Sequence, residues 1–266
     1  MADDKKIQAI LKKHYEYLEH RGFLVLGVFL YGSQNYELDS ETSDVDTIGL
    51  IIPTFDDLYN NTMVSATYSF PYSKDKCNYK DIRAFLELLK KSNPNILEVL
   101  FTKYSIVNEK YTQLLERIFL NRELIARYDK DKFINAAFGL FTSHYKKLSK
   151  MVTGNRQKEL AEMLRLRELI KTYIADELPY EKMLVPKKVA QLRAIKFGDV
   201  KLSSAELLSV IEEAYNEVKE KVDKYSAARN SENQIFINNL IYDVGYRIVS
   251  LESINCLIKK YNWKNF

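Results

Sequence analysis

Two aspartates two residues apart, Asp44 and Asp46, are the side chains of this sequence best suited to chemistry. They open an apolar run from Val45 to Ile52 that is typical of a buried strand. Side chains two apart on a strand share a face, so we expect both carboxylates to project together and to repel each other unless a cation lies between them. Oxygen ligands of this kind suit Mg²⁺, with Mn²⁺ as an alternative, because Mg²⁺ bridges protein carboxylates to substrate phosphates. The pair therefore predicts a divalent metal site.

A Gly-Ser pair stands at the end of the preceding apolar run, which extends from Phe23 to Tyr31. Gly32 has no Cβ and lets a triphosphate approach the backbone, while Ser33 offers a hydroxyl and an amide to its oxygens. Alone, a Gly-Ser after a strand is more often a turn. The joint arrangement of strand, Gly-Ser, about ten residues and then Asp-x-Asp on a second strand is more specific. It predicts a phosphoryl-transfer site.

Apolar periodicity divides the chain into two parts. Residues 1–105 combine a helix over 3–20 and the two buried strands with a weaker hairpin, Thr67–Phe70 and Cys77–Tyr79, and a helix that begins near Ile82. Residues 106–266 have helical spacing almost throughout, with turn-forming residues between the helices. The helices expected there cover residues 109–128, 131–150, 155–177, 203–225 and 232–262, separated by residues such as Gly154, Pro179 and Gly198. We expect a small α/β catalytic domain followed by a helical domain that contributes to binding.

Composition excludes several classes of protein. With 266 residues, 46% of them hydrophobic, the chain can fill a core and is not expected to be disordered. Charges interrupt the first twenty residues, and no stretch is apolar for the length of a membrane span. Cys77 and Cys256 lie far apart and indicate neither a disulfide framework nor a zinc site. We therefore expect a cytoplasmic protein with no membrane partner.

The charge is distributed unevenly. Residues 1–60 hold five Lys and Arg against eleven Asp and Glu, whereas residues 144–201 hold fourteen against seven. An acidic segment followed by a basic one suits a metal site beside a surface that receives a polyanion such as RNA. The alternative is a set of solvated helix faces.

The Gly32-Ser33 and Asp44-x-Asp46 arrangement resembles the signature of the DNA polymerase β nucleotidyltransferase superfamily. Later segments resemble a narrower group, the predicted bacterial and phage nucleotidyltransferases described as RNA-repair-pathway DNA polymerase β family proteins. These segments are Asp81–Leu86 with Asn93–Phe101, Lys158–Leu166, and Leu192–Asp199 with Leu202–Leu208. The resemblance implies an α+β fold with a mixed sheet and flanking helices, followed by a helical C-terminal domain. It also implies transfer of a nucleoside monophosphate from a nucleoside triphosphate to an acceptor hydroxyl.

The basic segment supplies two candidate phosphate ligands. Lys158 and Arg165 are seven residues apart and share a helix face, where they could hold the triphosphate or an acceptor phosphate. Solvent exposure is the alternative. The sequence departs from the family at two places: Ala84 stands where a Lys is usual, with Arg83 as a possible substitute, and Glu162 stands where a His is common.

The superfamily's third carboxylate has two candidates. Asp75 precedes the short strand candidate Cys77–Tyr79, whereas Asp81 stands at the start of a helix, where an Asp is ordinarily an N-cap. We expect Asp75 to be catalytic and to join Asp44 and Asp46 as a metal ligand. The alternative for Asp75 is a turn residue.

Four further polar residues receive structural interpretations. His14, His20 and His144 are scattered without metal-ligand spacing, so we expect surface or packing roles for them. Glu98 follows the Asn93-Pro94-Asn95 turn and is interpreted as an anchor between the helical part and the sheet.

The function expected from these observations is nucleotidyl transfer with two Mg²⁺ ions, one on the triphosphate and one that lowers the pKa of the attacking hydroxyl. The favoured acceptor is an RNA 3′ end, such as a tRNA end. One alternative is transfer to a protein or a small molecule, or synthesis of a nucleotide second messenger. Another is a nucleic-acid-binding or antitoxin-like module without turnover. The sequence does not indicate an oligomeric state.

Overall fold

The structure is a computed structural model that describes residues 4–150, 155–225 and 231–261. Within these residues the strands form one five-stranded sheet in the order β3-β4-β2-β1-β5. Strands β2 and β4 are parallel and the other neighbours are antiparallel, so the sheet is mixed. The strands are β1 (Leu24–Tyr31), β2 (Asp46–Ile52), β3 (Ser65–Ser69), β4 (Lys76–Asp81) and β5 (Ser105–Val107). The expected α+β class and mixed sheet are confirmed.

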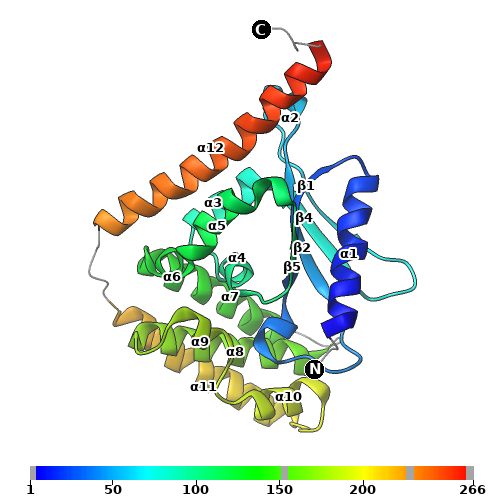
Figure 1. Cartoon of the computed structure of the whole chain (residues 1–266). Coiled ribbons are helices and arrows are strands. Elements are labelled where there is room, and N and C mark those ends of the chain that lie inside the picture. The colour runs from blue at the N-terminus through cyan, green and yellow to red at the C-terminus, as the bar shows by residue number, and fades with distance from the viewer. Residues whose placement is uncertain (1–3, 151–154, 226–230, 262–266) are drawn as a thin grey trace.

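Helix α1 (Asp4–His20) covers one face of the sheet (Figure 1). Ile7, Leu11 and Leu18 recur at helical spacing and pack in one buried cluster with Val28 and Leu30 of β1. This layer fixes β1 and β2 from one side, and both strands carry predicted site residues at one end.

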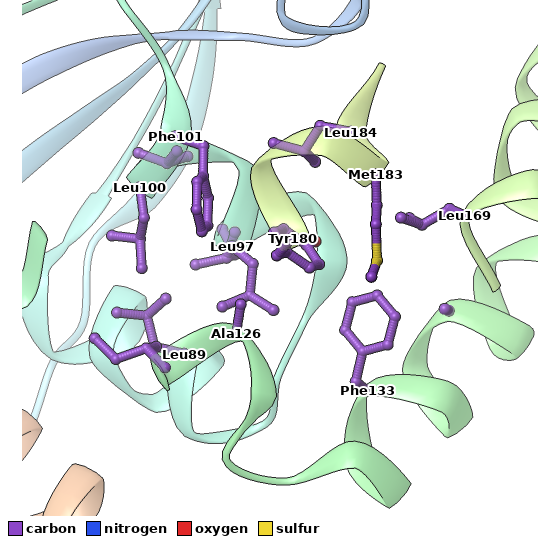
Figure 2. Close-up of a cluster of buried hydrophobic side chains, with 14 of the residues drawn as sticks. Leu89, Leu97, Leu100, Phe101, Ala126, Phe133, Leu169, Tyr180, Met183 and Leu184 are labelled. Atoms are coloured by element: carbon purple, nitrogen blue, oxygen red, sulfur yellow. The ribbon is translucent and has the colours of Figure 1, made fainter. Parts of the chain in front are cut away.

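The other helices lie on the opposite face of the sheet or beyond it (Figure 1). Figure 2 shows part of their core, where Leu97, Ala126, Phe133 and Tyr180 come together from four separate elements. The α-helices are α2 (Phe55–Tyr59), α3 (Ile82–Lys90), α4 (Pro94–Leu97), α5 (Thr112–Leu120), α6 (Arg122–Arg127), α7 (Lys130–Lys150), α8 (Arg156–Ala175), α9 (Tyr180–Leu184), α10 (Val189–Phe197), α11 (Ser204–Asp223) and α12 (Ser231–Tyr261). The short 3-10 helices are η1 (Ser33–Tyr36), η2 (Glu98–Phe101) and η3 (Glu109–Tyr111).

Most elements expected from the sequence are present. The weak hairpin is β3 and β4, which pair antiparallel. The single helix expected over 109–128 is instead η3, α5 and α6, because Asn121 ends α5 and its side chain donates to the carbonyl of Arg117 at 2.8 Å. Residues 3, 154 and 262, which bounded or separated expected helices, lie outside the described residues.

One hydrophobic core crosses the predicted boundary between residues 105 and 106. It joins Leu26 and Ile48 of the sheet to Phe133, Leu166 and other residues of the helical part. Strand β5 spans this boundary and pairs with β1 at the edge of the sheet. Helix α12, from the C-terminal part, packs on α3 and β2. The division of the chain into two domains at residue 105 stays a prediction. In the described part of the chain, no helix has the length and apolarity needed to cross a bilayer.

Candidate active site

A cavity of about 440 Å³ opens at the end of the sheet where β1 finishes and β2 begins. Antiparallel pairing places Tyr31, the last residue of β1, opposite Asp46, the first residue of β2. The cavity is therefore lined by residues from both strand ends and by residues of α8 that are distant in the sequence. Six of the seven predicted site residues line it: Gly32, Ser33, Asp44, Asp46, Lys158 and Arg165.

The Gly32 backbone needs a residue without a side chain. Its φ is 91°, in the region that favours glycine. A Cβ would find room there, at 4.0 Å from Oδ2 of Asp46, so the backbone conformation is the reason for glycine. The turn leads directly into η1. Ser33 lines the cavity, and its hydroxyl has no hydrogen-bond partner among the described residues. This geometry leaves the Ser33 hydroxyl available to a phosphate oxygen.

Glu98 fixes the Gly32-Ser33 turn through a hydrogen bond to its backbone. The N–H of Gly32 donates to Oε1 of Glu98 at 2.7 Å, and the Glu98 side chain is buried. Burial raises the pKa of this carboxyl to about 8, although the Gly32 hydrogen bond and the charge of Arg165 oppose the rise. Glu98 is expected from the sequence to anchor the helical part to the sheet. In the structure its contact is with the turn that bears Ser33.

Asp46 has a buried carboxylate oxygen that no other group of the described residues satisfies. Its Oδ1 is buried and has no hydrogen-bond partner. Burial, followed by the negative charge of Asp44, raises the pKa of Asp46 to about 6, while Lys76 and Lys158 act in the opposite direction. A buried carboxylate oxygen without a partner is unfavourable by itself, and a bound cation would remove that cost.

Lysines stand near the carboxylate pair. The side chain of Lys158 is exposed and has no ion-pair partner among the described residues. Lys196 of α10 also lines the cavity, is buried, and donates to the carbonyl of Leu38 at 2.7 Å. Burial lowers its pKa. The cavity thus combines the carboxylates of Asp44 and Asp46 with one exposed and one buried lysine, an arrangement that suits a phosphate chain bound with a metal ion.

Arg165 lines the cavity but is already engaged. Its Nε donates to Oε2 of Glu162 at 2.9 Å, and its guanidinium lies 3.9 Å from the centre of the Tyr36 ring. Burial opposes ionisation of Glu162, yet Arg165 and then Lys196 hold the pKa of this carboxyl below its usual value. Glu162 is therefore the counter-ion that orients Arg165.

Asp75 lies outside the cavity lining. It is buried just before β4, and its Oδ1 accepts from the N–H of Val45, the residue between the two site aspartates, at 2.9 Å. This contact gives Asp75 a structural role in positioning Asp44 and Asp46. Its additional role as a metal ligand stays a prediction.

Asp81 lies at the far end of β4. In the parallel β2–β4 pair, Asp46 is opposite Lys76 and Ile51 is opposite Asp81, which separates the two aspartates along the strands by about 16 Å. Asp81 caps α3 by accepting from the N–H of Arg83, and it also pairs with the Arg83 guanidinium. Arg83 is therefore engaged at that end of β4 and does not line the cavity.

Two histidines have defined environments. His14 is buried, 2.8 Å from Oγ1 of Thr47, and stacked on Phe70, as expected for a packing residue. His144, in contrast, lines the cavity, and its Nδ1 lies 2.8 Å from Oε2 of Glu159. Sequence reasoning missed His144 and Lys196 because neither has a local spacing to the aspartates.

A metal ion fits the residues present. Among the described residues, no three acidic, histidine or cysteine side chains gather closely enough to hold a metal ion by themselves. Mg²⁺ is usually bound by one or two carboxylates together with substrate phosphates, so Asp44 and Asp46 would suffice once a triphosphate is bound. The unpartnered Oδ1 of Asp46 is the donor atom such an ion would satisfy.

No protein-family model matches this chain, and no curated protein matches it. Among solved structures, the chain is similar to a nucleotidyltransferase-like protein from Exiguobacterium sibiricum 255-15. The sequence identity is 8%, the similarity covers 93% of this chain and 78% of that chain, and the TM-score is 0.30.

Proposed function

We propose that this protein is a metal-dependent nucleotidyltransferase that moves a nucleoside monophosphate from a nucleoside triphosphate to an acceptor hydroxyl. The observation that carries the proposal is the buried, unpartnered Oδ1 of Asp46 beside Asp44, in a cavity that also contains Ser33 and Lys158. Two adjacent carboxylates, one of them with a buried oxygen that no group in the described part of the chain satisfies, are unfavourable in a protein that binds no cation. A metal ion bound together with a phosphate chain would offset this cost.

The residues of the chain have distinct roles in this proposal. Asp44 and Asp46 would hold Mg²⁺ or Mn²⁺, with Asp75 as the proposed third ligand. The ions, when bound, would supply charge neutralisation of the triphosphate and a lower pKa of the acceptor hydroxyl. Ser33 and Lys158 bind phosphate oxygens. Arg165 and Lys196 supply fixed positive charge, and Glu98 positions the turn that carries Ser33. The acceptor oxygen bonds to the α-phosphorus, the bond to the bridging oxygen breaks, and pyrophosphate leaves.

The favoured acceptor is an RNA 3′ end. The net positive charge of residues 144–201 supports a polyanionic acceptor, and Lys158 and Lys196 bring part of that charge to the cavity. A protein or small-molecule acceptor, or a module without turnover, remains as an outcome of the test.

The test is to incubate the protein with each α-labelled nucleoside triphosphate, Mg²⁺ or Mn²⁺, and either total RNA or an RNA-depleted lysate. We expect label in RNA and none with Asp46→Asn. Label in protein or in a small molecule would retain the enzyme but change the acceptor. No transfer to any acceptor, together with no metal-dependent binding of a nucleoside triphosphate, would overturn the proposal.

A further inference from the structure

Helix α12 carries large exposed apolar side chains in addition to those that anchor it. Its inner side is buried on the body of the protein through Ile237, Ile241, Val244 and Ile248. A surface helix usually keeps its apolar side chains on one side only, and a helix that is apolar on several sides is normally covered. Among the described side chains, the exposed members are Ile235, Phe236, Tyr242, Tyr246, Leu251, Ile254 and Ile258. Figure 1 shows α12 at the edge of the molecule, with its outer side free of other elements.

One exposed strip of α12 is symmetric about its centre. Phe236, Asp243, Arg247 and Ile254 follow one another at steps of seven, four and seven residues, so they share one side of the helix. Phe236 and Ile254 lie nine residues before and after Gly245, while Asp243 and Arg247 lie two residues before and after it. Phe236 is 50% exposed, Ile254 is 56% exposed, and the side chain of Arg247 is 60% exposed.

We propose that this strip is the contact surface of a homodimer in which α12 packs antiparallel against α12 of a second copy about a two-fold axis near Gly245. An antiparallel pair centred there places Phe236 opposite the second copy's Ile254, and Arg247 opposite its Asp243. Each apolar end meets an apolar end, and each charge meets its opposite. A two-fold interface requires this kind of self-complementarity, because the same patch serves both copies.

The existing contacts of the strip are compatible with this exchange. Asp243 accepts from Arg117 of α5 and from Arg247, and the Asp243–Arg247 pair is partly exposed and four residues apart. Such a pair contributes little within one helix, so Arg247 can be shared with a second copy at small cost. The helix centre is also held firmly, since a Cβ on Gly245 would lie 2.6 Å from Cδ1 of Leu86 on α3. The strip is thus presented on a fixed support.

The apolar ends and the central charges together favour a second copy over an unrelated partner. An apolar groove-binding peptide would require no matching charges at the centre of the strip. A two-fold contact would give Asp243 and Arg247, which already pair within the helix, a second partner of opposite charge in the other copy. This inference is independent of the proposed function, since the strip contains no residue of the cavity.

The first experiment is sedimentation velocity of the whole chain between 1 and 50 µM. We expect a dimer of twice the 31.2 kDa chain, and we expect Phe236→Glu and Ile254→Glu to weaken the dimer at least tenfold. The matched control is Leu208→Glu, which places the same charge at a 48% exposed apolar residue of α11 and should leave the dimer intact. A monomeric wild type, or a dimer that both strip variants retain, would overturn the proposal.

Crosslinking tests the strip without a charge that could harm folding. In a Cys256→Ser background, F236C and I254C are purified separately, mixed and oxidised. Antiparallel pairing predicts a disulfide dimer in the mixture and little with either variant alone. Parallel pairing would instead link each variant to itself, and no crosslink in any sample would show that the strips do not meet. Either of these results contradicts the proposed dimer.

Discussion

At the scale of single residues, the carboxylate pair determines how the site responds to pH and metal. The pKa of Asp46 is raised to about 6, so the group is ionised at pH 7 at some cost to the metal-free fold. Since only the ionised form holds a cation, Mg²⁺-dependent binding of a nucleoside triphosphate should weaken as the pH falls through 6. Isothermal titration between pH 5 and 8 measures this change, and Asp46→Asn should show no such dependence.

Substitution of the pair should separate activity from stability. We expect Asp46→Asn to abolish transfer and to stabilise the metal-free protein by about 1 kcal/mol at pH 7, a figure reduced for the partial exposure of the group. Thermal unfolding with and without Mg²⁺ measures the effect, and Mg²⁺ with a nucleoside triphosphate should stabilise only the wild type. Near wild-type turnover in both Asp46→Asn and Asp44→Asn would contradict the proposal that these two carboxylates hold the metal ion.

Glu98 gives a second prediction at this scale. Glu98→Ala leaves the Gly32 N–H without its acceptor and opens a cavity, so we expect a loss of about 3 kcal/mol in the free energy of unfolding. Glu98→Gln keeps a carbonyl oxygen at the same place and should be close to wild type at about pH 4, below the usual pKa of the carboxyl. Because the pKa of Glu98 is raised to about 8, wild-type stability should decline from about pH 4.5 to pH 8 relative to Glu98→Gln. Denaturant unfolding across this range checks the slope, and parallel stability curves would show that burial does not perturb the carboxyl.

At the scale of elements, helix α8 carries two basic side chains with different surroundings: Lys158 is exposed, and Arg165 is buried and paired with Glu162. Lys158→Ala should leave the melting temperature unchanged while it weakens nucleotide or RNA binding and reduces the salt slope by about 0.7 per lost phosphate contact. Arg165→Ala should lower stability by about 3 kcal/mol, since it leaves Glu162 unpaired and removes the contact with Tyr36. Binding titrations at several salt concentrations, together with melting curves, distinguish the two. Equal effects of both variants on melting would contradict this division.

Strand β4 carries the two candidates for the third carboxylate at its opposite ends. In Asp75→Asn the side-chain oxygen can still accept from Val45, so we expect little change in melting but a loss of turnover by orders of magnitude. Asp81→Ala removes the cap of α3 and should cost about 1 kcal/mol while most activity is retained. An active Asp75→Asn would restrict Asp75 to its contact with Val45.

At the scale of the whole molecule, the continuous core predicts that the chain unfolds as one unit. Leu26 of the sheet and Leu166 of α8 belong to the same buried cluster, and α12 returns to pack on α3. We therefore expect one calorimetric transition whose van't Hoff and calorimetric enthalpies agree. Two resolved transitions would instead favour independent domains on either side of residue 105.

The sequence by itself determined the features that depend on near neighbours. The apolar runs predicted β1 and β2, and Gly32, Ser33, Asp44 and Asp46 followed from their positions at the ends of those runs. Helical spacing likewise located α1, α7, α8 and α11 to within a few residues. These signals are local because side-chain periodicity is set by backbone geometry over a few residues.

Only the tertiary structure decided which distant residues meet the strand ends. It joined Glu98 to Gly32 across sixty-six positions, brought Lys196 and His144 to the cavity, and placed Asp81 at the wrong end of β4 for the site. It also engaged Arg165 with Glu162 and Tyr36, which spacing on α8 alone could not indicate. These outcomes depend on strand register and on packing between elements, and both are set by contacts far apart in the chain.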